Sequence, residues 1–281
     1  MITFNPDKIL PWTANLGDGH EIQPRLQYFQ ANGTALCYAA IWHEEKISSE
    51  SHRLIAKAFA EFKPQAVITE GPVSIAEANK EADKEEFARN ALSFGQDEME
   101  EHYYACRLAV KNNIPYLSGE PSKQALQHYL IGQNYTAFDF FAYNFMLPLG
   151  YLQDEETDIE KLQRLWSAKR AQYDTIMVEK PPEDVTAFTQ WFYKGTGMEF
   201  AFGHLGGNHS DVNQPFGSVN HVSGLFHHYR DRHCLGVAEQ AVNAFDRVLV
   251  VYGAAHLWTL HPALEDGFAP SPAIKAKPGV T

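Results

Sequence analysis

Short apolar segments and longer helical patterns alternate along the chain. Four apolar runs have the length of strands: residues 36–42, 66–69, 114–117 and 248–251. Such runs are typical of strands that are buried on both faces of a sheet. Residues 50–62 and 97–111 lie between the first three runs and carry apolar side chains at helical spacing. This strand–helix alternation predicts a mainly parallel sheet with right-handed crossovers.

The middle of the chain is helical in character. Residues 134–150 are rich in Phe and Tyr, and residues 158–178 have the spacing of a long amphipathic helix. We therefore expect residues 1–281 to form a single α/β domain with helices on both faces of the sheet. A helical insertion at about 124–194 would cover part of that sheet.

Charge and cysteine content narrow the classes of partner. The chain has 281 residues and a formal net charge of -12. Because phosphate neutralisation needs clustered Lys and Arg, this charge argues against a nucleic-acid partner and an anionic membrane surface. No apolar run approaches the roughly 20 residues of a spanning helix. Three widely spaced cysteines form no pair motif, so we expect buried free thiols and a cytoplasmic protein.

Three predicted strands end in a residue that can bind or move protons. His43 and Glu70 directly follow the first two runs, and Gly253 breaks the last run shortly before His256. Because ligands bind outside the carboxyl ends of the strands in open α/β sheets, we expect these three side chains to meet. Two imidazoles and a carboxylate suit a hydrolytic metal site with an open position. They equally suit metal-free acid/base chemistry, and the sequence leaves both readings open.

Two further glutamates lie beside predicted strand ends and are second candidates. Glu44 follows His43, and Glu120 stands between Gly119 and Pro121. Glu120 is a candidate substrate-binding residue, with capping of the following helix as the alternative.

A basic and acidic triplet precedes the last strand. Arg230, Asp231 and Arg232 fall at the start of a helix expected from His227 to about residue 245. Cations at a helix start are disfavoured by the helix dipole, so their presence indicates a functional role. We expect them to bind an anionic substrate group or to stabilise an oxyanion. The alternative is a set of solvated charges on the first turn.

A loop rich in Gly, Asn and His precedes this helix, at residues 195–224. His204 and His209 within it are candidate substrate-binding residues, with simple exposure as the alternative. The loop lacks the Gly-x-x-x-x-Gly-Lys-Ser/Thr pattern of a phosphate loop, and the chain lacks a Gly-x-Ser-x-Gly nucleophile elbow.

The segment Val-Tyr-Gly253-Ala-Ala-His256 resembles the Gly-x-x-His motif of the TraB/Tiki group, within the erythromycin esterase/ChaN-like (EreA/ChaN-like) superfamily. In that group a first Gly-x-x-His ends one strand, a glutamate ends the next, and an Arg-(Asp/Asn)-Arg helix precedes the final motif. His43, Glu70 and residues 230–232 stand at these places, although Ala40 replaces the first glycine. The resemblance implies an α/β sheet with its site at the strand ends. It also implies metal-dependent proteolysis, macrolide ester hydrolysis or haem binding.

These patterns together predict a hydrolase that cleaves an ester or amide bond in a small-molecule or peptide substrate. His43 and His256 would ligate a divalent ion (Mn, Co or Zn) or act as base, Glu70 would ligate or orient water, and Arg232 would stabilise the oxyanion. The alternative is a binding protein that holds a peptide or haem in the same pocket without turnover. A third possibility is a protein whose site is no longer active, because Ala40 replaces the glycine of the first motif.

Overall fold

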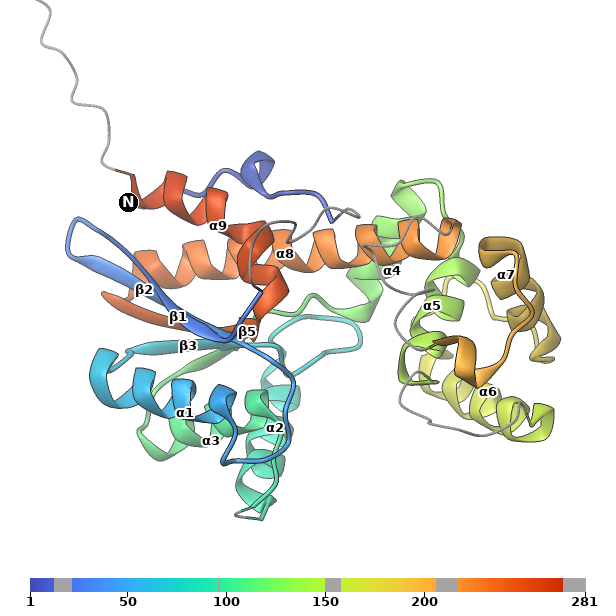
Figure 1. Ribbon diagram of the computed structural model, residues 1–281, viewed down its shortest axis with the longest axis horizontal. Coiled ribbons are helices and arrows are strands. Elements are labelled where there is room, and N and C mark those ends of the chain that lie inside the picture. The colour runs from blue at the N-terminus through green and yellow to red at the C-terminus, as the bar shows by residue number, and fades with distance from the viewer. Residues whose placement is uncertain (13–21, 96, 150–157, 206–216, 270–281) are drawn as a thin grey trace, which may run out of the picture.

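The computed structural model describes residues 1–12, 22–95, 97–149, 158–205 and 217–269. In that part of the chain a central sheet has the strand order β1-β2-β5-β3-β4 (Figure 1). The strands are β1 (Arg25–Ala31), β2 (Thr34–Ile41), β3 (Ala66–Thr69), β4 (Tyr116–Ser118) and β5 (Arg247–Gly253). β1 runs antiparallel to β2, and every other pair is parallel. The predicted mixed α/β class with a mainly parallel sheet is thus confirmed.

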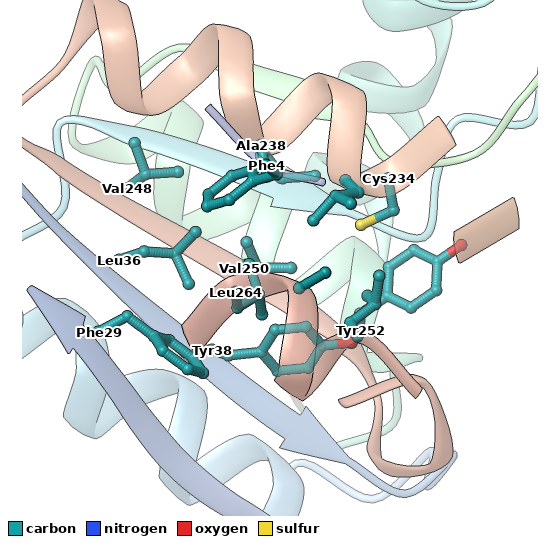
Figure 2. Packing of buried hydrophobic residues seen from close by; sticks show 14 of the residues in the cluster. Phe4, Phe29, Leu36, Tyr38, Cys234, Ala238, Val248, Val250, Tyr252 and Leu264 are labelled. Carbon is teal, nitrogen blue, oxygen red and sulfur yellow. The ribbon is translucent and has the colours of Figure 1, made fainter. Parts of the chain in front are cut away.

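The alternation of side chains along β2 and β5 gives the sheet two buried faces. On one face Leu36, Tyr38 and Val250 pack against α8 (Ser218–Ala244) and α9 (Ala254–Phe268), as Figure 2 shows. On the other face Leu249 and Val251 pack against a second group of helices. That group contains α1 (Glu50–Lys57), the π-helix η2 (Ala58–Phe62) and α3 (Glu101–Lys111), and α2 (Glu81–Ser93) packs on α3.

A second cluster of helices lies to one side of the sheet (Figure 1). It consists of α4 (Lys123–Gly132), α5 (Ala137–Leu149), α6 (Ile159–Tyr173) and α7 (Thr186–Thr196), with the short η3 (Phe202–Leu205). These helices share an aromatic core around Trp166, which contacts Phe141 and Phe145 edge-on at ring-centre distances of 4.8 and 4.9 Å. The Phe- and Tyr-rich stretch therefore forms part of the core of these helices.

Helix α8 connects the two parts. Its first half contributes Val219, Val222 and Phe226 to the aromatic core of the helical part. Its second half packs Cys234 and Ala238 against the sheet. Its 27 residues extend over about 40 Å at 1.5 Å per residue. The middle of α8 therefore lies where the sheet and the helical part meet.

Two expectations for this region are wrong. The helix begins at Ser218 and not at His227, so part of the predicted loop at 195–224 is helical. Arg230, Asp231 and Arg232 consequently lie in the interior of α8, and the argument from an opposing helix dipole does not apply to them. The hydrophobic pattern missed the first half of α8 because polar residues outnumber apolar ones in it.

Smaller features complete the fold. β1 and β2 form a hairpin in which Asn32 and Gly33 turn with φ of 52° and 85°. The helix expected at 97–111 begins at Glu101. Cys37, Cys106 and Cys234 are buried free thiols. No helix in the described ranges combines the length and the apolar character that crossing a membrane requires.

Candidate functional site

The parallel strands bring three side chains together above Gly253. His43 Nε2 lies 3.6 Å from one oxygen of Glu70, and His256 Nε2 lies 3.9 Å from the other. A Cβ atom placed on Gly253 would meet His256 Cδ2 at 3.4 Å, Glu70 Oε1 at 3.6 Å and His43 Nε2 at 3.8 Å. The glycine that ends β5 therefore leaves open the space that the three functional groups surround.

The strand register explains this convergence. Ile41, at the end of β2, pairs with Gly253, and Thr69, at the end of β3, pairs with Val251. His43 and Glu70 therefore leave the sheet on either side of β5, while His256 enters from the first turn of α9. Ala40 pairs with Tyr252 inside the sheet and is fully buried, so the alanine at this position lies within the core.

Asp231 fixes the orientation of His256. Its Oδ1 lies 2.5 Å from His256 Nδ1, while its Oδ2 accepts hydrogen bonds from Trp12 Nε1 at 2.6 Å and Thr259 Oγ1 at 2.7 Å. Asp231 is fully buried, so it positions His256 and does not contact substrate, which corrects its expected role. Because Nδ1 is engaged, Nε2 is the ring nitrogen that faces Glu70.

Arg230 joins two carboxylates beneath the site. Its Nε and Nη2 donate to Glu120 at 2.7–3.0 Å, and Nη2 also donates to Glu70 Oε1 at 3.2 Å. The Tyr252 hydroxyl donates a hydrogen bond to Glu120. Burial alone would raise the pKa of Glu120, but the Arg230 guanidinium lowers it below its ordinary value. The alternative of Glu120 as a helix cap is wrong, because Ser122 Oγ caps α4 through the Ala125 amide at 3.2 Å.

Three of the expected site residues are not seen in this arrangement, one because it is exposed and two because their side chains lie outside what the structure describes. Arg232 is exposed on α8, so the expected oxyanion role does not fall to it; Arg230 is the arginine of the triplet that reaches the site. His204 lies in η3, and its side chain is outside what the structure describes. His209 lies outside the described residues altogether.

Glu101 is a site residue that the sequence reasoning missed. It is 1% exposed, accepts a hydrogen bond from the Glu44 amide, and places Oε2 3.6 Å from His43 Nδ1. Its contact with His43, followed by the charge of Glu70, raises the pKa of His43 to about 9. Glu101 lies four residues before the buried Ala105 on α3, so helical spacing could have placed it on the inner face.

Two aromatic residues behind His256 were also missed. Trp12 stacks on His227 with ring centres 4.7 Å apart and meets His256 edge-on at 4.8 Å. His227 Nδ1 lies 3.1 Å from Arg230 Nη1. Burial, and then the charge of Arg230, lowers the pKa of His227 well below its ordinary value, so its ring is neutral. Nothing in the sequence around Trp12 links it to residues more than 200 positions away.

The site opens into a cleft of about 550 Å³ between the strand ends and the helical part. Its polar lining comprises Glu44, Glu45, Glu70, Glu100, Glu101, Glu120, His43, His102, Lys123 and Arg230. A second hollow of about 460 Å³ shares Glu70, Val73 and His102 with it and continues toward α2. His256, whose side chain is 6% exposed, lies behind Glu70 at the base. The two hollows could accommodate an extended substrate.

The described side chains do not form a ready-made metal centre. His43, Glu70 and His256 are suitable in kind, and the Asp231 contact is of the type that orients metal-bound imidazoles. However, the Arg230 guanidinium already lies 3.2 Å from Glu70 Oε1, and its positive charge would oppose a metal ion at that oxygen. Within the described ranges, no group of three or more His, Cys, Asp or Glu is placed to hold an ion.

The chain was compared with protein families, curated proteins and solved structures, and none of them matches it. The resemblance to the TraB/Tiki group therefore stays a prediction from short motifs. Conclusions about activity rest on the site geometry alone.

Proposed function

We propose that the protein is a hydrolase of ester or amide bonds, with the EreA/ChaN-like arrangement of its site at the strand ends. The observation that carries the proposal is the buried Asp231–His256 pair, with a 2.5 Å contact at Nδ1 and Nε2 directed toward Glu70. An aspartate that holds Nδ1 leaves Nε2 to accept a proton, which is the arrangement of a general base.

His43 supplies the complementary acid. Its raised pKa, about 9, makes the ring cationic at neutral pH. Its side chain is 65% exposed at the cleft mouth, where it can meet a substrate. A cation there stabilises negative charge on the carbonyl oxygen and can donate a proton to the leaving group. His43 thus takes the oxyanion role expected of Arg232.

The reaction proceeds by direct attack of water on the carbonyl carbon. His256 Nε2 accepts one proton from the water as its oxygen bonds to the carbon, and Glu70 orients the water. The bond to the leaving oxygen or nitrogen then breaks, with its electron pair going to the leaving atom, and His43 donates the proton that this atom takes up. Arg230 holds Glu70 in place through its 3.2 Å contact. No step passes through a metal ion.

The test replaces His256 by Gln and measures kcat/KM on 4-nitrophenyl esters and short peptide 4-nitroanilides. Loss of a general base lowers turnover by about 10²–10⁴-fold. His261→Gln is the matched control. His261 lies on the same helix, and away from the site it pairs with Glu265 at a distance of 3.6 Å. Unchanged turnover in His256→Gln overturns the mechanism. No turnover of either substrate class by the wild type overturns the hydrolase and favours the binding-protein alternative.

A further inference from the structure

Lys123 places an ammonium group in the cleft that no carboxylate neutralises. Its Nζ donates to Asn144 Oδ1 at 3.1 Å and lies 5.5 Å from the ring centre of Phe226. In the described ranges no carboxylate oxygen lies within 4.0 Å of Nζ. The other cationic groups of the cleft have carboxylate neighbours: Arg230 is bound to Glu120 and Glu70, and His43 lies 3.6 Å from both Glu70 and Glu101. Unlike Arg230, Lys123 therefore has an ammonium group that can form an ion pair with a ligand.

The surroundings are unfavourable for a cation without a partner. Burial lowers the pKa of Lys123 to about 8, against the opposing charge of Glu120. Lys123 is also the first residue of α4, where the helix dipole disfavours positive charge. A bound anion would relieve both costs.

Buried groups of the helical part fix the position of the ammonium group. Asn144 Oδ1 also accepts a hydrogen bond from Tyr173 Oη at 3.2 Å, and Asn144 Nδ2 donates to the Phe140 carbonyl at 2.9 Å. Asn144 is 3% exposed and Tyr173 is 1% exposed. Because an ammonium group has three N–H donors, the Asn144 contact leaves two for the cleft.

The start of α4 does not itself offer an anion site. The Lys123 amide donates to Ser74 O at 3.0 Å, and the Gln124 amide donates to Ile75 O at 3.0 Å. The Ala125 amide donates to Ser122 Oγ at 3.2 Å. Recognition of an anion at this end of the cleft therefore depends on the Lys123 side chain.

Most glutamates of the cleft lie beside a cation or a histidine. Glu70 and Glu120 share Arg230, Glu101 lies beside His43, and Glu100 lies beside His102. Glu44 and Glu45 follow β2, whereas Lys123 follows β4, and β5 and β3 lie between these strands. At roughly 4.8 Å per strand, the ends of β2 and β4 are about 14 Å apart.

We propose that Lys123 binds a carboxylate group of the substrate, next to an apolar group that contacts Phe226 and Leu147. This inference rests on the proposed function, because it takes the ligand to be the substrate of the hydrolase. It adds a substrate class to that function, namely esters or amides that carry a carboxylate. The apolar side chains of Phe226 and Leu147 line the same cleft as Lys123.

Binding of benzoate and benzamide, measured by titration calorimetry at pH 7, tests the inference without turnover. The two probes share a ring and differ in the carboxylate. We expect the wild type to prefer benzoate by about tenfold, as a charge-assisted contact gives. Lys123→Met should lose the preference, while Lys123→Arg and the exposed control Lys194→Met should keep it. Equal binding of the two probes by the wild type, or a preference that survives in Lys123→Met, overturns the inference.

A second measurement covers the case in which Lys123→Met does not fold. Acetic anhydride labels amines of the wild type at pH 8, and mass spectrometry of the peptides reports each lysine. Benzoate, but not benzamide, should slow labelling of Lys123 relative to Lys194. Equal labelling with both probes contradicts the inference.

Failure of the hydrolase and failure of this inference are distinguishable. A benzoate preference that depends on Lys123, without turnover of any ester or amide, overturns the hydrolase and supports the carboxylate site. Turnover with no carboxylate preference overturns the carboxylate site alone.

Discussion

Nδ1 of His256 lies 2.5 Å from Oδ1 of Asp231, and the two residues come from helices on either side of β5 in the chain. Asp231 is fully buried, and its other oxygen accepts from Trp12 and Thr259. The aspartate therefore lies behind the imidazole, away from the cleft. Its contribution to activity passes through the orientation of His256.

Replacing Asp231 by Asn should lower kcat while leaving KM close to the wild-type value. An amide at this position turns its NH2 toward either His256 or the two donors, so the ring loses its fixed orientation. A loss of about 10²-fold or more is expected for an impaired general base. The kcat and KM of Asp231→Asn, with thermal unfolding to verify folding, check this. A rise in KM alone would instead indicate direct substrate contact.

His43 should give activity an alkaline limit. Since its folded pKa is raised to about 9, the ring is a proton donor below that pH, and kcat/KM should fall as pH rises through about 9. His43→Gln should lower activity and remove this limb, while the exposed control His128→Gln keeps it.

The same shift makes a stability prediction. A raised folded pKa stabilises the native state below the ordinary value of 6.5, and this contribution is lost as pH rises toward 9. The difference in unfolding free energy between wild type and His43→Gln should narrow over that interval. A difference independent of pH would contradict the ion pairs with Glu70 and Glu101.

Arg230 and Arg232 should differ strongly in their effect on stability. Arg230→Met leaves Glu120 and Glu70, which are 5% and 8% exposed at the side chain, without their cation. Breaking such a buried pair costs about 3–5 kcal/mol of unfolding free energy. Arg232→Met, at an exposed position on the same helix, should change it by less than about 0.5 kcal/mol. Chemical denaturation of both variants measures the contrast, and equal effects would contradict the arrangement of α8.

Gly253→Ala should separate folding from activity. The added Cβ would lie 3.4–3.8 Å from the three site side chains, which is ordinary contact, and Gly253 has φ of -53°. The fold should therefore persist, while the methyl group fills the space where water and the carbonyl must meet. We expect kcat/KM to drop about 10²-fold with little change in Tm. Retained activity would show that the reacting groups meet elsewhere.

Chelation should leave activity intact, because the proposed mechanism has the Arg230 guanidinium and no metal ion beside Glu70. Dialysis against EDTA, followed by elemental analysis and the ester and amide assays, checks this. An absorbance scan of the same sample for a Soret band tests the haem alternative. Lost activity that Mn, Co or Zn restores would return the site to the metal-dependent class.

Local sequence patterns were sufficient for the four parallel strands of the sheet, although not for β1, and for the edge at which the candidate site lies. The run 66–69 coincides with β3, and the run 248–251 lies inside β5, because buried parallel strands are uninterruptedly apolar. From strand ends alone, His43, Glu70 and His256 could be expected at one edge, since parallel strands align their carboxyl ends. The geometry at Gly253 brings these three together.

The partners of those residues could not be found in the same way. Trp12 and Glu101 reach the site through tertiary packing, and no local pattern records which side chain a histidine will meet. The start of α8 was misplaced because its first turns are polar and glycine-containing, and burial against the helical part overrides that weak propensity. For the same reason the sequence pattern pointed to Arg232 for the oxyanion role, whereas Arg230, two residues earlier on α8, is the arginine that reaches the site.

Because α8 is one continuous helix, it fixes the number of residues between the two hydrophobic cores as well as their relative orientation. Phe226 and Cys234 belong to different cores, and Arg230 lies between them. One residue inserted or removed in this interval would rotate one core by about 100° against the other and carry the arginine away from its glutamates. Substitutions can accumulate along this interval, but its residue count is tied to the meeting of the two cores. Related chains with the same site should vary in their loops and keep this spacing.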